Sequence, residues 1–221
     1  MVKIERSKPA PKSLQIAKKK GKGSYRREDV IDRLREDFHD KCYLCETKGL
    51  QDPEVEHRLP HQNGKNLKRK YDWNNLFWSC GHCNNVKNKY YYSKNIIDCC
   101  KVDPEELLVF VAADESIQIE PVNKKKRSAK VTADLLNDVY NLTNTGIRLA
   151  ACDNRVKGVF IQMNLLFNAI NNYIDDSSNK DYEDTLKALL SRESEYAAFK
   201  RSYIRENKDL YPDVYGLIDE E

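Results

Sequence analysis

VEHRLPHQNGKNLKRKYDWNNLFWSCGHCNNVKNKY, spanning Val55 to Tyr90, is the stretch that decides the fold. It gathers histidines, asparagines and a Cys-x-x-Cys pair, and it has few apolar residues outside the Leu-Phe-Trp step. Side chains of these types bind metal ions and transfer protons. The stretch therefore raises two alternatives, a metal knuckle that only holds the fold or a site that performs a reaction.

Two Cys-x-x-Cys pairs bracket most of this stretch, Cys42 with Cys45 and Cys80 with Cys83. Each pair can aim two thiolates at one ion, and four thiolates form a closed tetrahedral zinc site. The alternative is two unrelated buried pairs. Because the chain shows no export signal, its seven cysteines favour metal binding over disulfides. We therefore expect a structural Zn²⁺ that clamps whatever residues 46–79 form.

Composition and charge limit the classes of protein to consider. The chain has 221 residues, of which 33% are charged, and its mean hydropathy is −0.78. No apolar run is long enough for a bilayer, and the N-terminus lacks the apolar core of a secretory signal. We expect a soluble cytoplasmic protein with no membrane partner. Residues 1–100 carry a net charge of +9 and residues 101–221 a net charge of −6, which suits a polyanion on the first half and a protein or solvent on the second.

Local patterns predict an α+β fold in three segments. Residues 1–24 hold proline, glycine and excess positive charge, and are expected to form a basic extended arm. Residues 25–122 should form the zinc-clamped unit, with a first helix from Ser24 to about Asp40 and a strand or hairpin after Pro104. Residues 123–221 show helical periodicity from about 132 to 210, which predicts a mostly α-helical region.

The order of polar residues inside the clamp resembles that of the HNH, or ββα-metal, nuclease family. The matching residues are Glu56-His57, Asn75-Leu76, the pair Cys80 and Cys83, Asn84 and Lys87. The resemblance covers roughly residues 40–95, and its specificity comes from the combination. It implies that residues 25–122 are an HNH nuclease domain built on a small ββα-metal core.

This resemblance implies a role for each matched residue. Glu56 and Asn84 would hold one Mg²⁺ or Mn²⁺, a hard ion that prefers oxygen ligands. His57 would be the general base, since an unperturbed histidine is neutral near physiological pH, and Asn75 would orient the loop that carries it. Adjacent strand residues point to opposite faces, so Glu56 and His57 share a site only where the strand ends or bends. Contacts to substrate phosphate are expected from His61, Lys68, Arg69, Lys70 and Lys87.

A closer resemblance involves KIERSKPAPKSL at the start, the HNH-like core, VDPEE and the helical tail. Together they are similar to the PtuB family, the nuclease subunits of Septu-type and retron-linked anti-phage defence systems. The resemblance implies an ABC/SMC-like ATPase partner (PtuA-like), a retron reverse transcriptase with its nucleic acid as a further partner, and DNA or tRNA as substrate. The helical region, residues 123–221, would be the partner-docking region.

Several alternatives stay open at this stage. His61 is a second candidate base, Asn85 a second candidate metal ligand, and His82 a replacement for one zinc thiolate. A function of another class is a zinc-stabilised module that binds nucleic acid or a partner without cutting. That alternative needs only the four cysteines and the basic loop, and it leaves the positions of Glu56, His57 and Asn84 unused.

Overall fold

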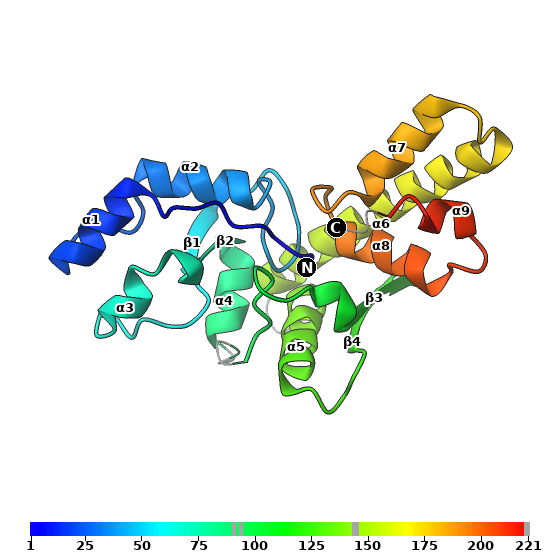
Figure 1. Ribbon diagram of the computed structural model, residues 1–221. Helices are drawn as coiled ribbons and strands as arrows, with labels where there is room; N and C mark the ends of the chain where they lie inside the picture. Colours follow the sequence, from blue (N-terminus) through cyan, green and yellow to red (C-terminus); the bar gives the residue numbers. More distant parts are fainter. Residues whose placement is uncertain (90–91, 93–94, 143–145, 219–221) are drawn as a thin grey trace.

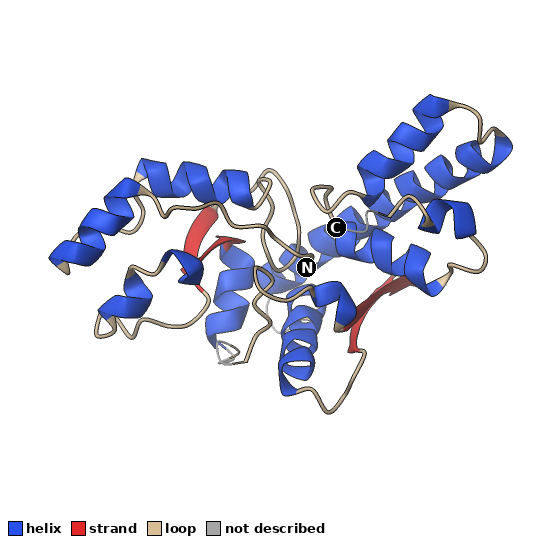
Figure 2. Ribbon diagram, viewed as in Figure 1, coloured by secondary structure: helices blue, strands red, loops and turns tan. Residues whose placement is uncertain are grey.

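The computed structural model describes residues 1–89, 92, 95–142 and 146–218, and over these residues the fold is mixed α+β, as expected. Helices predominate, and two small antiparallel hairpins lie among them (Figures 1 and 2). None of the described helices is both long and apolar enough to cross a bilayer. In chain order the elements are α1 (Lys12–Lys20), α2 (Glu28–Asp37), β1 (Pro53–His57), α3 (Leu67–Lys70), the 3-10 helix η1 (Trp73–Asn75), β2 (Leu76–Cys80), α4 (Gly81–Lys89), the 3-10 helix η2 (Pro104–Glu106), β3 (Leu108–Ala113), β4 (Ser116–Pro121), α5 (Arg127–Asn141), α6 (Gly146–Asp175), α7 (Lys180–Leu190), α8 (Ala197–Glu206) and α9 (Pro212–Tyr215).

The first hairpin pairs β1 with β2, and α4 follows β2 without a connecting loop. All five residues of β2 are buried, which explains why its sequence is a short continuous apolar run and not an alternating one. Helix α2 covers this hairpin, and the Phe38 ring at its end lies 5.5 Å from the ring of Phe77. Glu56 pairs with Phe77 in the strand register. The hairpin is therefore held from outside by α2 and continues directly into α4.

The N-terminal segment differs from the expected extended arm in two ways. First, Met1, Val2 and Ile4 are buried in the core, and the Ile4 N–H donates to the Cys99 carbonyl at 3.0 Å. Second, residues 12–20 form the helix α1, because Leu14 and Ala17 are spaced to bury one face. The positively charged residues of this segment therefore lie on the exposed side of a helix and not on an extended arm.

Arg6 fixes this segment to the first hairpin. Its guanidinium donates to the carbonyls of Leu76 and Trp73 at 2.6 and 2.7 Å, and its carbon lies 4.0 Å from the Trp73 ring centroid. Its Nε also lies 3.4 Å from the Asp37 carboxylate.

Helix α2 starts at Glu28 and not at Ser24, because the Ser24 hydroxyl accepts from the nearby Arg26 N–H instead of capping the helix.

The helical half shares its core with the first half. One contiguous cluster of buried apolar side chains runs from Met1 to Ile218, across the boundary expected near residue 122. The predicted helical periodicity is confirmed in α5, α6 and α7. The buried positions that follow it are Leu135, Leu136, Val139, Val159, Met163, Leu166, Ile170, Leu186 and Leu190.

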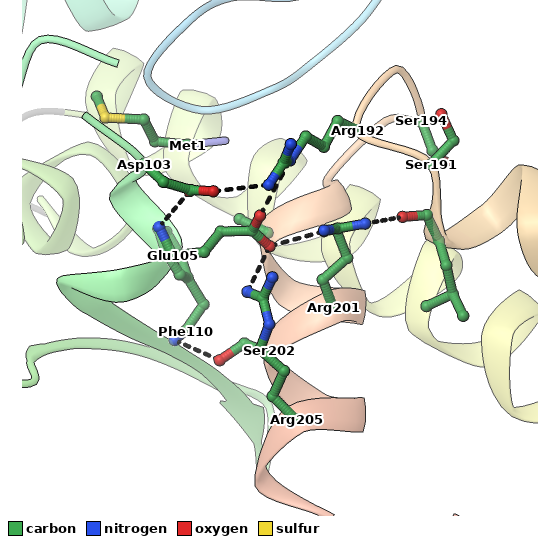
Figure 3. Close-up of polar contacts among 12 residues, drawn as sticks. Met1, Asp103, Glu105, Phe110, Ser191, Arg192, Ser194, Arg201, Ser202 and Arg205 are labelled. Atoms are coloured by element: carbon green, nitrogen blue, oxygen red, sulfur yellow. Dashed lines mark hydrogen bonds and ion pairs between the residues drawn. The ribbon is translucent and has the colours of Figure 1, made fainter. Parts of the chain in front are cut away.

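A buried ionic cluster, shown in Figure 3, attaches α8 to the segment before the second hairpin. The Glu105 carboxylate, only 3% exposed, lies 2.7 Å from both the Arg201 and the Arg205 guanidinium. Arg192 bridges Glu105 at 3.3 Å and Asp103 at 2.6 Å. Burial alone would raise the pKa of Glu105, but Arg201 and Arg205 outweigh it and lower that pKa. The segment at Asp103 and Glu105 thus supplies two carboxylates that pair with three arginines.

We predict that Glu105→Ala strongly destabilises the fold. Removing the carboxylate leaves Arg201, whose side chain is fully buried, without its counter-ion, and breaking such a pair costs about 3–5 kcal/mol. The free energy of unfolding from urea denaturation measures the loss. Glu106→Ala removes the same charge from the exposed neighbouring residue and should change the stability little. Equal losses in the two variants would contradict this account.

Candidate active site and metal centre

Four cysteine sulfurs from the two knuckles converge at one buried point. The sulfurs of Cys42, Cys45, Cys80 and Cys83 all lie within 4.8 Å of one another. The distance from the Cys45 to the Cys80 sulfur is 3.9 Å, close to the edge of about 3.8 Å of a tetrahedron with metal–sulfur bonds of about 2.3 Å. The structure thus brings together the predicted ligands, and they can hold a metal ion such as zinc.

The C-terminal half supplies polar groups around this cluster. Arg155 of α6 places its guanidinium 3.1 Å from the Cys80 sulfur, and the Tyr140 hydroxyl of α5 donates to the Cys45 carbonyl at 2.9 Å. The Thr47 hydroxyl lies 3.2 Å from the Cys45 sulfur and 3.0 Å from the Tyr196 hydroxyl. Groups of this kind orient metal ligands and adjust their charge. The cluster is therefore enclosed by both halves of the chain.

The thiols share negative charge unevenly. Burial alone would raise the pKa of the Cys45 thiol, but hydrogen bonds from the other three cysteines and the charge of Arg155 lower it well below its ordinary value. A hydrogen bond from Cys42 is the largest cause of the lowered pKa of Cys80. Burial raises the pKa of Cys42 and Cys83 well above the usual value. Some of the sulfurs thus favour the thiolate form that binds metal.

The alternative zinc ligand has a different partner. His82 lies inside the second knuckle, but its Nε2 is 3.0 Å from the Val139 carbonyl on α5. The cluster of sulfurs does not include it. The ring of His82 thus joins α4 to α5.

His57 is the last residue of β1 and is held in one orientation. Its Nε2 lies 3.0 Å from the Lys70 carbonyl, and because a carbonyl only accepts, Nε2 carries the proton and Nδ1 is the acceptor. The rings of Tyr25 and His61 pack edge-on against it, with centroids 4.5 and 4.3 Å away. Burial is the main cause that lowers the pKa of His57 from 6.5 to about 4. The imidazole is therefore neutral at physiological pH.

Asn75 ties together the loop between the two strands. Its side-chain oxygen accepts from the Leu59 N–H at 2.8 Å, and its amide donates to the carbonyls of Leu59 and Arg69 at 2.9 and 3.0 Å. Arg69 directly precedes Lys70, whose carbonyl holds His57. A carboxamide offers four hydrogen-bonding positions, and the Asn75 side chain, only 4% exposed, uses three of them. Asn75 therefore fixes both ends of the loop that follows His57.

Lys87 lies in the interior, which differs from the expected phosphate contact. Its ammonium is 1% exposed, 2.6 Å from the Glu56 carboxylate and 2.9 Å from the His57 carbonyl. Glu56 faces α4, the helix that carries Lys87. The charge of Lys87 is neutralised by this carboxylate, so it binds α4 to β1 and does not reach the surface.

Only one oxygen of Glu56 is occupied. Oε1 accepts from the Tyr43 hydroxyl at 2.6 Å and from Lys87, whereas Oε2 is buried and has no hydrogen-bond partner among the described residues. A buried carboxylate oxygen left without a partner costs free energy unless a bound species satisfies it. Oε2 is therefore the Glu56 oxygen that no described residue satisfies.

Asn84 is a half-buried residue at the edge of the exposed side of α4. Its amide nitrogen donates to the Glu54 carboxylate, and its oxygen accepts from the Asn88 amide at 2.8 Å. Glu54 was not expected at the site, although its spacing of two residues from Glu56 places both on one strand face. Asn85, the alternative ligand, is exposed and lines the hollow formed with Glu54 and Asn84.

A cleft of about 330 Å³ brings the predicted residues together. Glu56, His57, His61 and Asn84 all line it. Lys68, Arg69 and Lys70 lie outside its lining, on the short helix α3, where Lys68 is exposed and Arg69 and Lys70 are half-buried.

The cleft also contains residues that the sequence analysis missed. Tyr25 and Arg26 lie in its wall, and the Arg26 guanidinium lies 5.3 Å from the Tyr25 ring centroid. They lie some thirty residues before His57, and their only signal was the basic pair Arg26-Arg27 just before α2.

Comparisons with known proteins add no family. The chain matches no model of a protein family and no curated protein.

We predict one zinc ion per chain, bound by the four cysteines. Metal analysis of the purified protein should give one equivalent, and Cys80→Ser should lose it together with cooperative thermal unfolding, since structural zinc supplies much of the folding free energy of small metal-bound units. Cys100→Ser, at a half-buried cysteine outside the cluster, is the matched control and should retain the metal. Zinc bound equally by both variants would exclude this site.

Proposed function

We propose that this chain is a metal-dependent endonuclease of the HNH type, with structural zinc at the four cysteines. The observation that carries the proposal is the arrangement of His57 at the end of β1, Asn75 directly before β2, and Asn84 on α4, which follows β2 without a loop. It has the order hairpin, then helix, expected of a ββα-metal core. A module that only binds nucleic acid has no need of a histidine fixed in one tautomer beside an unpartnered carboxylate oxygen.

His57 is the general base in this proposal. Nε2 is engaged by the Lys70 carbonyl, so Nδ1 is the nitrogen that accepts a proton from an attacking water. Asn75 acts through the loop, because it holds the Arg69 carbonyl next to the carbonyl that orients His57. Asn75 is thus a positioning residue and does not touch substrate. His61 and Arg26 line the same cleft, and in this proposal they contact the substrate phosphate.

The donor atoms around the cleft fit a hard divalent cation. The Glu56 Oε2 atom and the Asn84 amide oxygen would hold Mg²⁺ or Mn²⁺, which prefer oxygen ligands. Such an ion, when bound, neutralises charge on the phosphate and on the leaving oxygen. Lys87 and Tyr43 hold the other oxygen of Glu56, so the carboxylate is aimed before any ion arrives.

The wider role follows the resemblance of the sequence to the PtuB family. We infer that the chain is the nuclease subunit of a cytoplasmic anti-phage complex, gated by an ABC/SMC-like ATPase, with DNA or tRNA as the substrate. A nuclease under such control would be inactive until its partner responds. The helical region, residues 123–221, is the proposed contact with that partner.

We predict that His57→Ala reduces cleavage by about 10²–10⁴-fold, the usual contribution of a general base. Plasmid, single-stranded DNA and total tRNA would be offered with Mg²⁺ or Mn²⁺, with and without the ATPase. Binding of the same nucleic acids, measured without added Mg²⁺ or Mn²⁺, should stay within about twofold. His39→Ala, at a half-buried histidine outside the cleft lining, is the control. Undiminished cleavage by His57→Ala would reject this base.

We predict that cleavage persists at pH 5. A base must be neutral, and with a pKa of about 4 roughly nine-tenths of His57 stays neutral there, compared with about 3% for a histidine of pKa 6.5. The rate should therefore fall only below about pH 5. The dependence of kcat/KM on pH measures this limb, and a midpoint near 6.5 would show that His57 is solvated like an ordinary histidine or is not the base.

A further inference from the structure

A basic hollow lies beside the cleft, between α1 and α2. Its volume is about 780 Å³, within the range of ligand sites, and it is lined by Lys20, Lys22 and Arg27, all exposed. We define this basic hollow by those three residues. Two carboxylates, Glu28 and Asp29, also line it, and both oxygens of Asp29 accept from Ser13, so the five charged side chains of the lining carry a net charge of +1.

The hollow has a fixed shape. Helix α1 is terminated by Gly21, whose φ of +64° is left-handed, a conformation that favours glycine. The next turn is held by the Tyr71 hydroxyl, which donates to the Gly23 carbonyl at 3.0 Å. Lysines in the last turn of α1 also interact favourably with the helix dipole. The positive charges are thus carried by an ordered turn and not by a tail.

The hollow is continuous with the cleft along the chain. Ser24 and Arg27 line the hollow, whereas the intervening Tyr25 and Arg26 line the cleft that holds His57. The Tyr25 ring packs on the His57 ring, so this four-residue segment forms the wall shared by the two depressions. An extended anion that enters the cleft therefore meets the basic hollow on one side.

We propose that the basic hollow binds the phosphodiester backbone of a nucleic-acid strand on one side of the bond positioned at His57. The inference rests on the proposed function for the place of the cut, but the binding itself does not. Lysine and arginine at such a surface contact phosphates and set register without reading bases. The exposed Ile16 side chain in the same wall adds an apolar contact for sugar or base.

The test compares two triple variants in a His57→Ala background, so that binding is measured without cleavage. Lys20→Gln/Lys22→Gln/Arg27→Gln removes the hollow's charge. Lys124→Gln/Lys125→Gln/Lys126→Gln removes the same charge from the exposed segment before α5, which lies far from α1 (Figure 1). Fluorescence anisotropy would use one sequence as single-stranded DNA, duplex DNA and single-stranded RNA over a range of KCl concentrations.

The hollow variant should bind at least tenfold more weakly in 0.1 M KCl. The slope of log K against log salt should become shallower by about 2, since each phosphate contact contributes about 0.7–0.9. Lys20→Arg/Lys22→Arg/Arg27→Lys should retain the original slope, because it keeps the charges. The nucleic acid with the largest loss identifies the backbone that the hollow accepts.

Two outcomes would overturn the proposal: a parent chain that binds none of the three nucleic acids, or equal losses in the hollow and control variants. Failure of the nuclease assignment looks different. If cleavage is undetectable or survives His57→Ala, but the hollow variant still loses binding, the surface stands and the catalytic assignment falls. If His57→Ala abolishes cleavage but the hollow variant binds normally, the catalytic assignment stands and the proposed binding surface is rejected.

Discussion

The meeting of four cysteine sulfurs within 4.8 Å is the constraint on which the rest of the structure depends. The two knuckles lie 35 residues apart in the chain, and β1, α3 and β2 all occur between them. Because the second knuckle also spans the end of β2 and the start of α4, closing the cluster fixes the direction in which α4 leaves the hairpin. That direction places Asn84 and Lys87 against the face of β1 that carries Glu54 and Glu56.

The hydrogen bonds of Asn75 are a second constraint, which acts on the loop that follows His57. The side chain of Asn75 joins Leu59 to Arg69, and the adjacent Lys70 carbonyl decides which nitrogen of His57 carries the proton. Rigid supports of this kind matter for a proton acceptor, since an error of about 1 Å in its position is costly for catalysis. The insert between the knuckles is thus held by hydrogen bonds where it approaches His57. Its basic helix α3 is the more exposed part.

Much of this arrangement could be predicted from the sequence, since it depends on local spacing. The two cysteine pairs predicted the sulfur cluster, and the order of Glu56, His57, Asn75 and Asn84 anticipated residues that line or support one cleft. Helical periodicity likewise located α5, α6 and α7. The spacing of residues in the sequence does not predict which lysine is buried. Lys87 resembled a surface charge, yet Glu56 neutralises it in the interior. The positions of Tyr25, Arg26 and α1 depend on long-range packing, for which the local sequence carries no signal.

Gly158 shows how closely the two halves are joined. A Cβ atom there would lie 2.6 Å from the Tyr196 hydroxyl, so only glycine lets that ring cross α6 and reach Thr47 beside the sulfur cluster. Arg155, one turn earlier on α6, approaches the same cluster from its other knuckle. The consequence concerns modularity. The first half therefore cannot be transferred to another protein by itself, because its sulfur cluster would lose the covering contacts of Arg155 and Tyr196. Exchange of parts during evolution would have to move both halves together.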